Sequence, residues 1–80
     1  MIATFNEKHH AELFEAARAE GSAIGAAVRE HGWVAADQTI ARAATGWVNR
    51  QPLNNIKLEV ELRWAYIIAA ETAATAEVLP

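Results

Sequence analysis

Histidine, serine and carboxylate side chains are the groups of this chain that could do chemistry, and they are densest in EKHHAE at 7–12. Adjacent residues on a helix point about 100° apart, so His9 and His10 cannot both face one metal ion from a single turn. His9 and Glu12 share a face, but two ligands do not make a zinc site. We therefore expect no metal centre here, only a solvated helix face.

The other candidates for catalysis are isolated residues in ordinary positions. His31 falls in the last turn of an expected helix, where a cation is favourable against the helix dipole. Ser22 is the single serine, and its surroundings, GSAIG, match neither a nucleophile elbow nor a phosphate-binding loop. Glu59 and Glu61 diverge on a helix, and nothing in the sequence buries them for acid catalysis. We expect no enzyme activity and no cofactor.

The composition predicts a small all-α domain. Nineteen of the 80 residues are alanine, the best helix former, although its side chain buries little area. The absence of cysteine excludes disulfides and thiol chemistry. Because chains of this size seldom bury enough apolar surface alone, we expect one domain over 1–80 that associates with itself or with a partner.

Charge and hydropathy narrow the possible partners and location. The formal net charge is −3, which does not favour nucleic acid, because that ligand requires clustered basic residues. The N-terminus lacks a basic region followed by an apolar run, so no secretory signal is expected. The longest weakly polar run, 64–76, is too short for a bilayer span of about 20 residues. We expect a cytoplasmic protein without a membrane segment.

Capping signals predict where the first helix begins and ends. Thr4 and Glu7 match a capping box, in which each side chain satisfies a backbone N–H at the helix start. A first helix is therefore expected from Phe5 to about Glu20. Gly21 is expected to stop it, because glycine is unfavourable inside helices.

Two more short helices are expected before the chain breaks. Ser22 can cap one that ends at His31, with Gly32 in the position where helices commonly end in glycine. Another is expected over about 34–49. The stretch NRQPLNN, at 49–55, contains the proline and asparagines typical of a break.

Residues 56–66 have the alternation of an amphipathic strand. Their apolar positions are Ile56, Leu58, Val60, Leu62, Trp64 and Tyr66. An α+β fold, with this strand paired across a dimer, is therefore an alternative. A helix is favoured, because no Gly, Pro, Asn or Asp interrupts 56–79 and alanine-rich sequence follows. The expected fold is a small bundle of three short helices packed on one long C-terminal helix over 55–77.

The long helix would carry two apolar stripes. The first is a heptad seam made of Leu58, Leu62, Ala65, Ala69, Thr72, Ala76 and Leu79. The second is made of Ile56, Val60, Trp64, Ile67 and Ile68, with Glu59 and Arg63 at its rim. Three short helices can cover one stripe, so the second is expected to contact another chain. Trp64 is the expected hot spot.

These features favour a small protein-interaction module, acting as an inhibitor or adaptor that covers a surface of a target protein. The expected partners are that target and a second copy in a homodimer. Short chains without motifs are common among phage and mobile-element accessory proteins. This suggests an accessory role on general grounds, and no residue of this chain shows it. A structural homo-oligomer without a catalytic role is one alternative.

The other alternative is a DNA-binding regulator. The stretch QTIARAATGWVNRQ at 38–51 opens like the first helix and turn of a helix-turn-helix reader. Its recognition helix would then lie near 48–57. Pro52 interrupts that segment, and Arg42 replaces the alanine expected four residues before Gly46. Both departures count against nucleic-acid binding.

Overall fold

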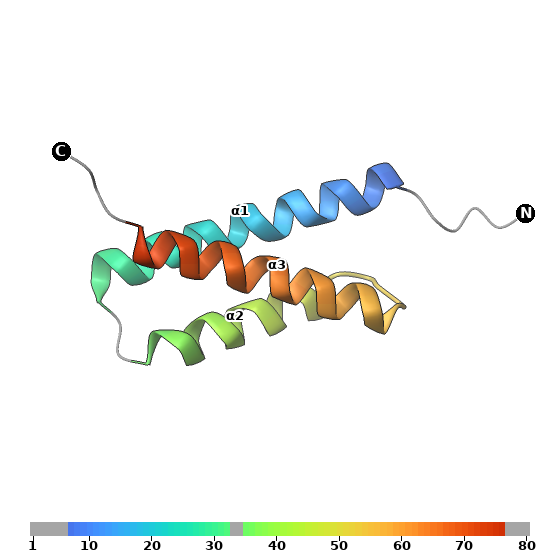
Figure 1. Ribbon diagram of the computed structural model, residues 1–80. Helices are drawn as coiled ribbons and strands as arrows, with labels where there is room; N and C mark the ends of the chain where they lie inside the picture. Colours follow the sequence, from blue (N-terminus) through green and yellow to red (C-terminus); the bar gives the residue numbers. More distant parts are fainter. Residues whose placement is uncertain (1–6, 33–34, 77–80) are drawn as a thin grey trace, which may run out of the picture.

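The computed structural model describes residues 7–32 and 35–76, which form three α-helices (Figure 1). α1 spans Glu7–His31, α2 spans Ala36–Asn49 and α3 spans Ile56–Thr75. The chain runs along the molecule, back and along again, so α1 and α3 are parallel and α2 is antiparallel to both. α1 and α3 form the principal contact, and α2 packs more lightly against each. The all-α class and the helix favoured for 56–66 are confirmed. The alternative prediction of a strand there is wrong, because those residues belong to α3.

The expected break at Gly21 does not occur, because 7–31 is one continuous helix. Gly21 and Gly25 are buried where α1 crosses α3. A Cβ added to Gly21 would overlap the carbonyl oxygen of Tyr66, and one added to Gly25 would overlap that of Ala70. These glycines therefore permit close backbone approach and do not end the helix. The bundle has two helices before the C-terminal one, where three were expected.

Rows of residues spaced by four align α1 with α3. The row on α1 is Leu13, Ala17, Gly21 and Gly25, and the row on α3 is Leu58, Leu62, Tyr66 and Ala70. Both rows are the i±4 ridges by which helices commonly interlock. The expected heptad seam is confirmed at Leu58 and Leu62. At Ala65 and Ala69, which are half-buried, and at Thr72 and Ala76, which are exposed, the seam is wrong, because burial continues to Tyr66 and Ala70 instead. Leu79, its last member, lies outside the described residues.

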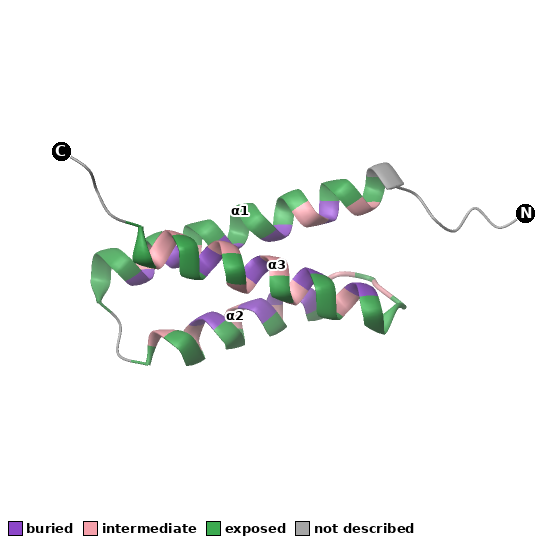
Figure 2. Ribbon diagram, in the orientation of Figure 1, coloured by how far each residue is buried: buried purple, intermediate pink, exposed green. Residues whose placement is uncertain are grey.

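α2 closes the core from one side. Its buried residues are Ile40, Ala44, Trp47 and Val48. The Trp47 ring lies 6.0 Å from the Tyr66 ring, inclined by 43°, while Ile40 packs with Val28 and Ala70. Figure 2 shows the buried positions along the facing sides of the three helices. The core thus uses one face of α3, and the other two described helices do not cover the opposite face.

The helix ends follow local capping chemistry. Gly32 has a φ of 62°, and its N–H donates to the Val28 carbonyl at 2.8 Å, which confirms the expected C-terminal glycine of α1. The loop over 50–55 confirms the expected break. Asn55 then starts α3, because its side-chain oxygen accepts a hydrogen bond from the Leu58 N–H at 3.1 Å. The capping box expected at Thr4 lies outside the described residues.

Candidate functional site

The groups that could do chemistry do not gather in one place. His9 and His31 are exposed near opposite ends of α1, and His10 is half-buried. Ser22, expected as an N-cap, is exposed in the middle of α1. Within 7–32 and 35–76, no three His, Asp or Glu residues could together hold a metal ion. Apart from the aromatic side chains of Trp47 and Tyr66, no residue with a polar or charged side chain is buried among those whose burial the structure describes.

The outer face of α3 is the unusual surface of this molecule. It carries a row that we call the outer stripe: Ile56, Val60, Trp64 and Ile68. This row is offset by two residues from the buried row of α3, which is about 200° around a helix. The exposed fractions are 79% for Ile56, 59% for Trp64 and 57% for Ile68. α3 is therefore apolar on two opposite faces, and α1 and α2 cover only one.

Ile67 does not belong to this surface, contrary to expectation. It is half-buried and packs against both clusters of the core. Its neighbour Ile68 points about 100° away and stays exposed. Glu59 and Arg63 are half-buried and lie between the buried row and the outer stripe; their place at the rim of an interface stays a prediction. Five of the seven residues expected to bind protein are large and apolar, and four of those five form the outer stripe.

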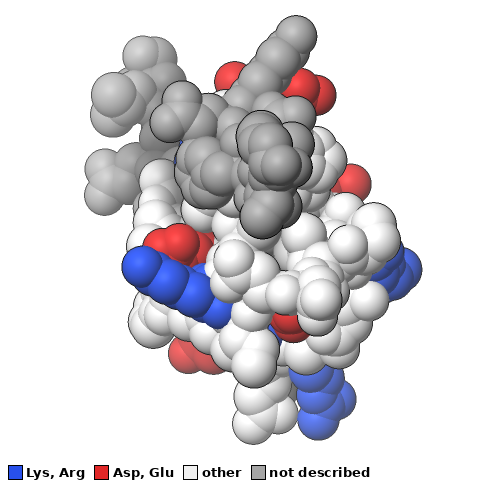
Figure 3. Space-filling model, turned by 90° about the vertical axis from the view of Figure 1, so that its right-hand side faces the viewer, with Lys and Arg blue, Asp and Glu red and all other residues white. Residues whose placement is uncertain are grey.

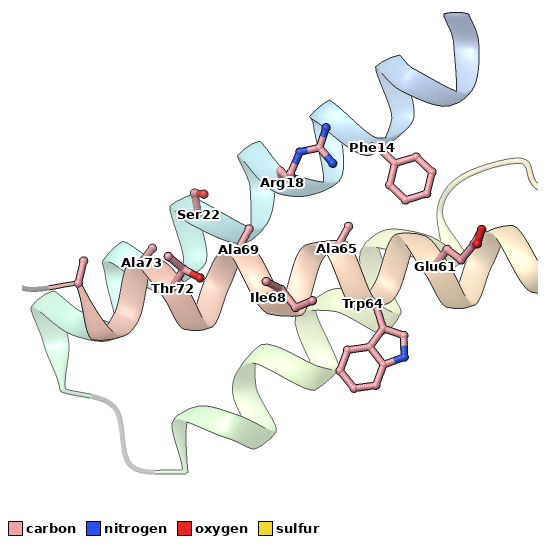
Figure 4. Close-up of a pocket in the computed structure, with 11 residues that line it drawn as sticks. Phe14, Arg18, Ser22, Glu61, Trp64, Ala65, Ile68, Ala69, Thr72 and Ala73 are labelled. Atoms are coloured by element: carbon pink, nitrogen blue, oxygen red, sulfur yellow. The ribbon is translucent and has the colours of Figure 1, made fainter. Parts of the chain in front are cut away.

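A groove between α1 and α3 adjoins the C-terminal half of the outer stripe (Figure 4). Its volume is about 890 Å³, and it is open to solvent. Its α3 side includes Ala65, Ala69 and Ala73, and its α1 wall carries Phe14, Arg18 and Ser22. In Figure 4 the alanines point from α3 towards α1, while Trp64 projects from the other edge of α3. The groove can receive an apolar surface, but it offers few polar groups to orient a small ligand.

The α1 wall of the groove was not among the expected site residues. Phe14, Arg18 and Ser22 each follow a buried residue of the α1 row by one position. Their spacing of four residues places them along one edge of that row. The sequence predicts that these three residues share an edge of α1 only if α1 is known to continue through Gly21.

On the face that Figure 3 shows, the Lys and Arg side chains of the described residues do not gather into one basic cluster. Basic and acidic side chains are interspersed there, at the end of the molecule that carries the α2–α3 connection. The prediction of a recognition helix near 48–57 is wrong, because this segment contains the end of α2, a loop and the start of α3. Among the residues that the structure describes, no helix is both long enough and apolar enough to cross a membrane.

Comparisons with protein-family models, with curated proteins and with solved structures give no match. The function is therefore inferred from the outer stripe and the groove beside it.

Proposed function

We propose that this chain is a protein-interaction module that binds a helix of a target protein over the outer stripe and the groove. The observation that carries the proposal is the exposure of four large apolar side chains in one row of α3. Single exposed apolar residues are normal on protein surfaces, whereas a contiguous apolar patch marks an interaction site. Covering a target surface in this way suits an inhibitor or an adaptor and requires no catalytic group.

The shape of the surface supports a helical ligand. Apolar anchors on a bound helix recur every three or four residues and fit an apolar groove. The alanine side chains along α3 leave room for close helix approach, as small residues do at helix contacts. Trp64 stands at the edge of the groove, and tryptophan is enriched among the residues that dominate binding energy.

The substitution Trp64→Asp tests this proposal. The side chain is 59% exposed, so the variant should keep its helical circular dichroism spectrum. Losing a central tryptophan typically costs at least 2 kcal/mol of binding free energy, which is about a 30-fold loss of affinity. The tagged chain is used to capture proteins from a lysate, and retained proteins are quantified for each variant.

Thr45→Asp is the matched control, because Thr45 is exposed on α2 and lies outside both the outer stripe and the groove. A protein retained by the wild type and by Thr45→Asp but lost with Trp64→Asp supports the proposal. If every captured protein is retained equally by Trp64→Asp, the outer stripe is not the binding surface.

A further inference from the structure

We infer that the outer stripe also binds a second copy of this chain, with the two α3 helices antiparallel and centred on Trp64. The inference rests on the proposed function, because it uses the same surface and names one occupant. Two features of the described residues support a second copy: the area of the stripe and the distribution of charge along it.

The area of the outer stripe is enough for a modest dimer. At about 150–200 Å² for each side chain, the lower part of the range for aromatic residues, the exposed fractions of the four residues, 36% for Val60 among them, correspond to about 400 Å² of apolar surface. If all of this surface is buried and makes up the share of about 65% that is apolar in homodimer interfaces, the interface covers about 600 Å² on each copy. The pair then buries about 1,200 Å², the lower limit for a stable interface.

The charges along α3 fit an antiparallel partner. Lys57 and Glu71 are both exposed, and each lies seven residues from Trp64. In an antiparallel pair centred on Trp64, Lys57 of each copy is level with Glu71 of the other, and Val60 is level with Ile68. A parallel pair would place Lys57 beside Lys57 and Glu71 beside Glu71, where like charges oppose association.

The dimer and the target complex would then be alternatives, since both cover Trp64. Self-association holds the apolar face away from solvent until a target with higher affinity displaces the second copy. The amount of binding-competent monomer would depend on the total concentration of the chain, which is a simple form of regulation.

Charge reversal tests the antiparallel register. Lys57→Glu and Glu71→Lys each turn two attractive contacts of the dimer into repulsive ones, so each should weaken dimerisation by about five-fold. The double variant restores both contacts and should return to the wild-type dissociation constant. The reversals place a negative charge near the start of α3 and a positive charge near its end, both favourable to the helix dipole. This gain offsets the like-charge repulsion that Lys57→Glu introduces with Glu61 one turn later.

The measurement is sedimentation equilibrium of the full chain at low salt, for the wild type, the two single variants, the double variant and Trp64→Asp. A wild-type dimer, weakened in each single variant and restored in the double, supports the inference. A double variant no tighter than the single ones overturns the antiparallel register, and a wild type that is monomeric at all concentrations overturns the dimer. The capture experiment tests the proposed function separately. If the wild type is monomeric but Trp64→Asp loses a captured protein, the proposed function stands without the dimer. If the wild type is monomeric and Trp64→Asp captures the same proteins, the dimer and the proposed function are both refuted.

Discussion

At the scale of single residues, the aromatic side chains separate into structural and surface roles. Trp47 and Tyr66 are 8% and 5% exposed and lie against each other in the core, whereas Trp64 projects from α3. Burial raises the pKa of Tyr66 above its usual value of 10.0, the charge of Glu20 raises it further, and Arg50 opposes both. The neutral phenol is therefore favoured in the folded state.

This raised pKa predicts a loss of stability in alkali. Below pH 10, Tyr66 is neutral in both states and its contribution is complete. As the pH rises above 10, the unfolded chain releases the phenolic proton more readily, so the free energy of unfolding falls until the pH passes the pKa of the folded state. Urea unfolding between pH 8 and 11.5 measures this fall, and Tyr66→Phe should lack it.

Tyr66 is the only tyrosine, so ultraviolet absorbance follows its ionisation directly in the folded protein. A phenol that titrates at the ordinary pKa, with the same pH dependence of unfolding in the wild type and in Tyr66→Phe, would contradict the prediction.

At the scale of elements, the sequence predicted α2 and α3 better than α1. The end of α2 at Asn49 and the helix after Asn55 were recognisable from local signals. The continuity of α1 was not recognisable, because Gly21 and Gly25 are required only where α1 packs against Tyr66 and Ala70, 45 residues further along the chain. Local propensity treats Gly21 as a helix stop, and tertiary contact overrides it.

The crossing predicts opposite effects for glycine substitutions in two helices. Gly25→Ala should lower the free energy of unfolding by about 1–3 kcal/mol, because overlap with the Ala70 carbonyl forces the helices apart. Gly46→Ala should raise it by up to about 1 kcal/mol, because alanine favours the helix. Its Cβ would meet only the guanidinium of Arg50, at 3.4 Å, and that flexible side chain can move.

Urea unfolding followed by circular dichroism compares the two variants with the wild type. Equal stabilisation by both substitutions would show that α1 and α3 do not approach as closely as the structure indicates.

At the scale of the whole molecule, the sequence predicted that α3 would keep an apolar face beyond the reach of its neighbours. It predicted the outer stripe but also included Ile67, because a helical wheel alone cannot tell which flank α1 and α2 cover. The groove could not be predicted, since it depends on how α1 lies against α3. Because α1 and α2 cover only one side of α3, the molecule is stabilised further by whatever covers the other side.

If a second copy covers that side, thermal stability depends on protein concentration. Above the dissociation constant, each tenfold increase in concentration adds about 1.4 kcal/mol per mole of dimer to the free energy of unfolding. With an unfolding entropy of about 2.1 cal/mol/K per residue, Tm should rise by about 4 °C per tenfold increase.

Scanning calorimetry across a concentration series measures this slope. Trp64→Asp should have a flat response, because without the outer stripe unfolding involves one chain at every concentration. A flat response in the wild type as well would mean that no second copy covers the apolar face of α3 in the isolated protein.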